Sequence, residues 1–97
     1  RTSRYSDGMP AARLVVYTKP GCHLCDDMLD LLHTALRGTA VAVTERNIAL
    51  DLDEFERFKH DIPVLMIDGR EVARHRISEP ALRAALDAAG LGRAAPR

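Results

Sequence analysis

The chain has two cysteines, Cys22 and Cys25, which stand three residues apart where one hydrophobic pattern gives way to another. A continuous apolar run, residues 14–17, precedes them, and apolar residues at helical spacing follow as far as Arg37. The first pattern is typical of a buried strand and the second of an amphipathic helix. The sequence therefore predicts a strand, a turn and a helix that begins at Cys22, with both thiols at the junction.

A cysteine at the start of a helix lies beside backbone N–H groups that have no partner inside the helix, and these groups favour the reactive thiolate. We therefore expect Cys22 to be a nucleophile and Cys25, one turn further in, to be the less exposed resolving thiol. Lys19 and His23 add positive charge nearby. Asp26 opposes them from the same helix face, so we predict a moderately lowered pKa for the Cys22 thiol.

Composition and charge narrow the classes of function. The 97 residues suffice for one small domain, and the 14 basic and 14 acidic residues balance. Without a basic excess or an apolar run of about 20 residues, neither a nucleic-acid-binding surface nor a membrane span is indicated. A secreted disulfide framework needs more cysteines, and no signal peptide is visible, so we expect a cytoplasmic location. We also expect a monomer without a bound organic cofactor.

Apolar spacing and turn residues divide the rest of the chain. We expect a disordered lead-in over residues 1–12, one domain over 13–90, and a flexible tail over 91–97. Residues 1–8, which precede Met9, are either native or added. The predicted strands cover residues 14–19, 41–48, 64–67 and 71–75, and the predicted helices cover 22–37, 51–61 and 78–90. Since the first strand is apolar throughout, we expect it to be buried on both faces.

The predicted order is strand, helix, strand, helix, strand, strand, helix. A right-handed crossover would make the first two strands parallel, and Asp68-Gly69 is a strong hairpin signal between the last two. One compact arrangement accommodates both the parallel pair and the hairpin, namely an α/β fold with a four-stranded mixed sheet and helices on both faces.

This βαβαββα order, with a Cys-x-x-Cys at the first helix and a proline opening the third strand, resembles the thioredoxin fold. Several motifs resemble the glutaredoxin branch of that superfamily. They are Tyr17-Thr18-Lys19 before Cys22, Ile62-Pro63, and Ile67-Asp68-Gly69 followed by Glu71-Val72. The resemblance covers residues 14 to about 90 and is nearest to short glutaredoxin-like proteins with a Pro-Gly-Cys-x-Leu-Cys active site.

The resemblance implies a thiol–disulfide oxidoreductase in which Cys22 and Cys25 form the redox-active disulfide. It also implies a cis peptide at Ile62-Pro63, where the backbone of Ile62 could pair with an extended peptide or with glutathione. Lys19 and His23 are candidate substrate contacts, with plain solvation as the alternative for each. The implied partners are protein disulfides or glutathione, together with a reductase that the sequence does not identify.

The chain also departs from its relatives. The departures are Leu24 where glutaredoxins have an aromatic residue, Ala73-Arg74 in place of a glycine pair, Arg76-Ile77 in place of acidic residues, and Val16 in place of the buried aspartate of thioredoxins. A cation at Arg76 would repel the glutathione ammonium, which argues against glutathione in its usual pose. The basic run of residues 74–76 is either solvated or binds an acidic partner or an anionic thiol.

Other functions use the same cysteines. A zinc site needs four ligands and one Cys-x-x-Cys supplies two, while His33, His60 and His75 follow no metal-finger spacing, so we predict no metal site within one chain. The main alternative is a module that binds an iron–sulfur cluster or a thiophilic metal through Cys22, shared across a dimer. A third possibility is a degenerate redox fold that serves only as an interaction domain.

Overall fold

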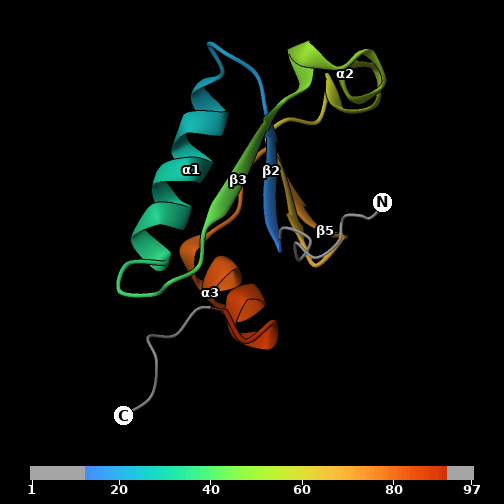
Figure 1. The fold of residues 1–97 in the computed structure, drawn as a ribbon. Helices are drawn as coiled ribbons and strands as arrows, with labels where there is room; N and C mark the ends of the chain where they lie inside the picture. Colours follow the sequence, from blue (N-terminus) through green and yellow to red (C-terminus); the bar gives the residue numbers. More distant parts are fainter. Residues whose placement is uncertain (1–12, 92–97) are drawn as a thin grey trace.

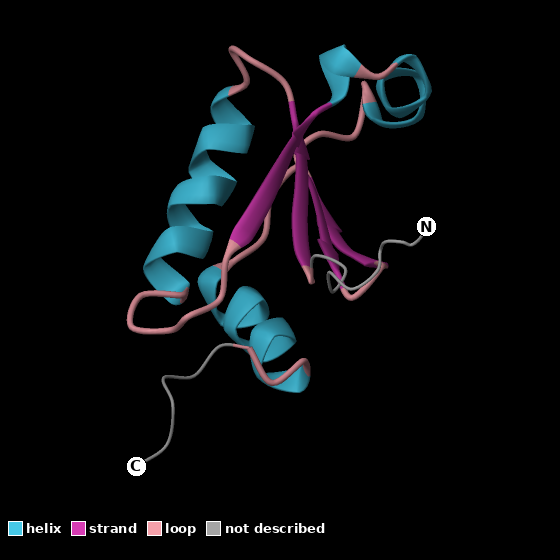
Figure 2. Cartoon of the chain, viewed as in Figure 1, coloured by secondary structure: helices cyan, strands magenta, loops and turns pink. Residues whose placement is uncertain are grey.

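The computed structural model describes residues 13–91, which form a sheet flanked by helices (Figures 1 and 2). The strands are β2 (Leu14–Thr18), β3 (Val43–Asn47), β4 (Val64–Ile67) and β5 (Arg70–Arg74). The helices are α1 (His23–Ala35), α2 (Leu52–Phe58) and α3 (Glu79–Ala88), and the 3-10 turn η1 (Ile48–Leu50) joins β3 to α2. The predicted lead-in, and the predicted tail apart from Leu91, lie outside the described residues.

The four strands form one mixed sheet in the order β3-β2-β4-β5. β2 lies inside the sheet, parallel to β3 on one side and antiparallel to β4 on the other. β4 and β5 form the predicted hairpin, whose turn residues Asp68 and Gly69 have φ angles of 52° and 81°. Positive φ at both central residues is what a two-residue hairpin turn of type I′ requires. The predicted four-stranded mixed sheet is confirmed.

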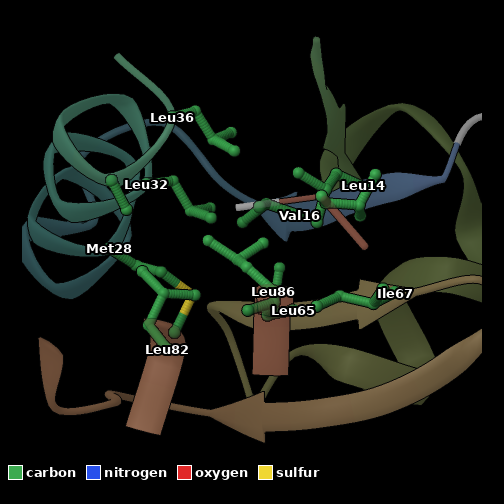
Figure 3. Close-up of a cluster of buried hydrophobic side chains, with 11 residues drawn as sticks. Leu14, Val16, Met28, Leu32, Leu36, Leu65, Ile67, Leu82 and Leu86 are labelled. Atoms are coloured by element: carbon green, nitrogen blue, oxygen red, sulfur yellow. The ribbon is translucent and has the colours of Figure 1, made fainter. Parts of the chain in front are cut away.

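One face of the sheet packs against α1 and α3 and carries the main core (Figure 3). The core residues drawn with labels are Leu14, Val16, Met28, Leu32, Leu36, Leu65, Ile67, Leu82 and Leu86. Leu91 joins this core, is 5% exposed and donates its backbone N–H to the carbonyl of Leu86 at 2.8 Å. The last described residue thus packs with the domain, one position beyond the predicted end.

The opposite face packs against α2, so helices cover both faces as predicted. The ring of Phe58 stacks on that of Tyr17 with centroids 4.3 Å apart, and Val64 is buried beside them. Since α2 is short, it covers only one end of this face and leaves Val15 and Met66 half-buried. Both faces of β2 are thus covered, as expected for an interior strand, but the face toward α2 is covered less completely than the face toward α1 and α3.

The second strand and the second helix are shorter than predicted. β3 begins at Val43 and ends at Asn47, whose side chain accepts a backbone N–H from two residues on at 2.8 Å. This bond caps η1, which takes Ile48 out of the strand. α2 ends at Phe58, and Asp61 donates its N–H to the Phe58 carbonyl in a tighter turn. The predicted bounds of β4 and the predicted start of β2 match the structure, and the remaining boundaries differ by one or two residues.

Arg13 ties together three parts of the fold away from the cysteines. Its guanidinium donates to both carboxylate oxygens of Asp68, at 2.6 and 2.7 Å, and to the carbonyl of Ala89 at 2.8 Å. The hydrogen bond from Arg13 holds the pKa of Asp68 below its ordinary value of 3.8. A second carboxylate, Glu71, also has a lowered pKa because Arg74 donates to it.

We expect this ion pair to make stability depend on pH in acid. Since the folded-state pKa of Asp68 is depressed, its contribution is complete above the unfolded value and is lost as pH falls through the folded value. Asp68→Asn keeps a side chain that tolerates positive φ but removes the charge. The difference in unfolding midpoint between the parent chain and this variant should shrink as urea titrations move from about pH 6 to about pH 2. A constant difference would contradict the prediction.

Candidate active site

The cysteine pair lies where β2 turns into α1. Gly21 has a φ of 80°, a conformation that glycine adopts without strain, and this lets the chain reverse direction after Pro20. Cys22 is the N-cap of α1, and its Sγ accepts the backbone N–H of Cys25 at 3.1 Å. The helix start that the sequence predicted is thus confirmed, and the Cys22 sulfur occupies the place of a capping oxygen.

The two sulfurs are bonded to each other, with Cα atoms 5.2 Å apart, but they differ in access. Cys22 is half-buried, whereas Cys25 is 1% exposed and is flanked on its helix by the buried Met28. A molecule in solution can therefore reach the Cys22 sulfur much more readily than that of Cys25. Such asymmetry suits one attacking and one internal thiol.

Ile62 and Pro63 join the same end of the sheet. Their peptide bond is cis, as the resemblance implied, and Pro63 is fully buried. Since Tyr17 pairs with Val64 in the antiparallel ladder, Pro63 lies opposite Thr18. This end of β2 leads into residues 19–22, which we call the cysteine turn. Figure 1 shows this turn and the connection from α2 to β4 at the same end of the sheet.

The backbone around the cis peptide is already partly engaged. Ile62 donates its N–H to the carbonyl of Phe58 at 3.2 Å, and the carbonyl of Pro63 accepts the N–H of His75 at 2.8 Å. Within residues 13–91, the carbonyl of Ile62 has no such partner. Ile62 thus offers its carbonyl, but not its N–H, to an incoming strand.

Lys19 and His23 are both exposed. Lys19 follows β2, and His23 directly follows Cys22 as the first residue of α1. Lys19 also lines a cavity of about 330 Å³ beneath the turn, together with Cys25. Asp26 and Glu45 place carboxylates in the walls of the same cavity. The structure thus brings all six predicted site residues to one end of the sheet, and it adds Glu45, which the sequence did not single out.

A second cavity, of about 320 Å³, lies on the other side of the first turn of α1. Leu24 contributes to its wall, and Arg76 faces it from the loop between β5 and α3. His75 has a φ of 68°, and its ring nitrogen lies 2.8 Å from the carbonyl of His60, which fixes this loop. Among the sequence features, only Arg76, which stands in place of an acidic residue of glutaredoxins, gave a signal for this cavity.

The basic run of residues 74–76 is divided by its contacts. Arg74 is occupied by Glu71 at 2.7 Å and by Asp61 at 3.1 Å, and hydrogen bonds and charges from both raise its already high pKa. Arg76 has no ion-pair partner among the described residues. Of the two arginines, Arg76 is therefore the one available to an external anion.

Cavity size alone does not locate this site. A larger cavity, of about 470 Å³, lies at the opposite end of the sheet beside Asp68 and Ala89 and contains no cysteine. Across residues 13–91, no three histidine, cysteine or acidic side chains gather closely enough to hold a metal ion. No helix in that range is long and apolar enough to cross a bilayer. The cysteine turn is thus the chemically distinctive feature.

A mixed sheet with a cis-proline strand and a Cys-x-x-Cys capping the first helix defines a thioredoxin-fold protein. A mutant thioredoxin from Halobacterium salinarum NRC-1 shares this fold, with a TM-score of 0.54 and 19% identity over 86% of this chain and 76% of that chain. The family model described as Glutaredoxin-like domain (DUF836) matches residues 13–87. The chain therefore belongs to the glutaredoxin-like family.

Two relatives agree with that assignment. The glutaredoxin-like protein YDR286C homolog of Dictyostelium discoideum is 32% identical over 72 residues, which cover 68% of this chain and 67% of that protein. The X-ray structure of protein XcR50 from X. campestris superposes with a TM-score of 0.67 and 34% identity, over 77% of this chain and 96% of that one. The resemblance and the fold predicted from the sequence are both confirmed.

Proposed function

We propose that this protein is a thiol–disulfide oxidoreductase that reduces or exchanges disulfides through Cys22 and Cys25. The observation that carries the proposal is the asymmetry of the pair. The Cys22 sulfur caps α1 and accepts the Cys25 N–H at 3.1 Å, whereas Cys25 is 1% exposed. The backbone N–H stabilises a thiolate at the sulfur that substrate can reach, and the second thiol is held next to it.

The proposed reaction has two steps. In the reduced protein, the Cys22 thiolate attacks one sulfur of a substrate disulfide, which forms a mixed disulfide and releases the first substrate thiolate. Cys25 then attacks the Cys22 sulfur, which releases the second substrate thiol and closes the Cys22–Cys25 disulfide. The substrate gains the two electrons that the cysteine pair loses, and an external thiol or a reductase must return them.

Protein or peptide disulfides fit the proposed site better than glutathione in its usual pose. An extended chain can donate one hydrogen bond to the free carbonyl of Ile62. The N–H of Ile62 is not available, because it already donates to the carbonyl of Phe58. Arg76 would repel the glutathione ammonium but would attract an acidic side chain or a carboxylate. Lys19 and His23 are proposed as further contacts beside Cys22. The scheme needs no bound cofactor and only one chain, and a reducing cytoplasm would suit it.

The test is a redox titration of the purified protein in glutathione buffers, read by intact mass after thiol alkylation. We expect a single two-electron transition at a potential between glutaredoxin and thioredoxin values, about −200 to −270 mV. A lasting adduct of glutathione on Cys22 would instead make the protein glutathione-dependent. Retained iron or zinc without any disulfide across the range would overturn the proposal and favour a metal-binding module.

A further inference from the structure

Cys25 needs a proton acceptor before it can attack. Its thiol is 1% exposed, and only its thiolate is a competent nucleophile. Burial in apolar surroundings disfavours the thiolate. Val16, the fully buried residue of β2 in the core beneath α1, is apolar, so β2 itself supplies no base there. If the proposed reaction occurs, another group must take this proton.

The sheet register places a carboxylate next to that position. Val16 of β2 pairs with Glu45 of β3, and paired residues of neighbouring parallel strands project from the same face of the sheet. Val16 lies in the core under α1, so Glu45 projects from the same face as α1, at the edge of the sheet. The neighbouring strand β3 thus supplies a carboxylate next to the apolar Val16 of β2.

The cavity beneath the cysteine turn connects this carboxylate to the thiol. Cys25 and Glu45 both line it, and its volume of about 330 Å³ far exceeds the 10–15 Å³ or so that one water needs. Asn47, also in the wall, adds an amide that can hydrogen-bond to such a water. A proton can therefore pass from Cys25 to a carboxylate through water, without direct contact.

We propose that Glu45 accepts the proton of Cys25 through cavity water in the resolving step, an inference that rests on the redox function proposed above. The Cys25 S–H bond breaks and its proton moves to Glu45. The thiolate then forms a bond to the Cys22 sulfur, and the bond from Cys22 to the substrate sulfur breaks. Glu45 then gives up this proton to the departing substrate thiolate or to solvent, which returns Glu45 to its charged form.

Three charged groups line the cavity, namely Lys19 from the turn, Asp26 from α1 and Glu45 from β3. Asp26 directly follows Cys25 in the helix, and adjacent helical residues do not face each other. It instead lies one turn after Cys22 and donates its N–H to the Cys22 carbonyl at 3.1 Å. Glu45 belongs to β3, outside the helix that carries Cys25, and it lines the same cavity as Cys25, so Glu45 is the carboxylate that we assign to Cys25.

The test separates the two steps with dithiobis(nitrobenzoic acid), an aromatic disulfide that releases one coloured thiolate when Cys22 attacks and a second when Cys25 resolves. In stopped-flow mixing with the reduced protein, Glu45→Gln should slow the second phase about tenfold or more near neutral pH. The first phase should change less than about twofold. Raising the pH should restore the second phase, and Glu45→Asp should recover part of the rate.

Asp30→Asn is the matched carboxylate variant, because Asp30 is exposed on α1 and does not line the cavity, and it should leave the second phase close to that of the parent chain. A second phase in Glu45→Gln equal to the parent at every pH would overturn the inference, as would an equal slowing in Asp30→Asn. A parent chain that releases no coloured thiolate would instead refute the redox function itself. Because Glu45 is exposed on an edge strand, its variants should unfold at the parent's urea midpoint, and this excludes misfolding as the cause.

Discussion

Replacing Cys22 with serine is expected to abolish disulfide exchange, whereas replacing Cys25 with serine should stop the reaction halfway. A hydroxyl at residue 22 cannot attack a disulfide at neutral pH, so turnover should fall by several orders of magnitude. In Cys25→Ser, the reachable sulfur of Cys22 is kept, and the mixed disulfide has no internal thiol to resolve it. A covalent adduct of the whole substrate thiol should then accumulate and be visible by intact mass.

The two variants also test which cysteine is the nucleophile. Cys25→Ser should react with an alkylating reagent faster than Cys22→Ser does, because Cys25 is 1% exposed and Cys22 is half-buried. Both variants should fold, because serine differs from cysteine only in having an oxygen in place of the sulfur. The opposite order of alkylation, or exchange activity in Cys22→Ser equal to the parent, would show that Cys22 is not the nucleophile.

The largest effect on stability is expected from Leu65→Ala. Leu65 has no exposed surface and packs in the core between β4 and the helices α1 and α3. The loss of its side chain removes apolar burial and leaves a cavity, which together cost about 2–5 kcal/mol in well-packed cores. For a domain of this size, whose total stability is about 5–15 kcal/mol, such a variant is close to unfolded. Urea denaturation followed by circular dichroism measures the change.

Leu50→Ala is the matched control for this measurement. Leu50 is 84% exposed, so the same chemical change there should alter the unfolding free energy by no more than about 0.5 kcal/mol. Equal losses in the two variants would contradict the assignment of the core, because the cost would then follow the residue type and not its burial.

The cysteine turn was predictable because its signals are local. Pro20 and Gly21 mark the end of the strand, and Cys22 stands where an N-cap belongs, so the helix start follows from neighbouring residues alone. The hairpin at Asp68-Gly69 was predictable for the same reason. In these places, residues close in sequence decide the conformation, and tertiary packing agrees with them.

The parts that the sequence did not reveal depend on contacts between distant residues. The role of Glu45 as a cavity wall follows from the register of β3 against β2, which no local pattern fixes. The bond between the His75 ring and the His60 carbonyl spans two loops. The early end of β3 reflects a side-chain cap by Asn47, which competed with the extended conformation.

The interior position of β2 has a consequence for how the chain acquires its structure. β2 comes first among the described elements, yet one of its two ladders is completed by β4, about 50 residues further along. Closing that long loop costs entropy before any packing rewards it. The segment through β3 would lack Leu65, Leu82 and Leu86, so it cannot bury the apolar face of β2 by itself. As a ribosome releases the chain, the thiol pair therefore emerges well before the fold that distinguishes its two sulfurs, and both cysteines are equally open to oxidants and to other thiols during that interval.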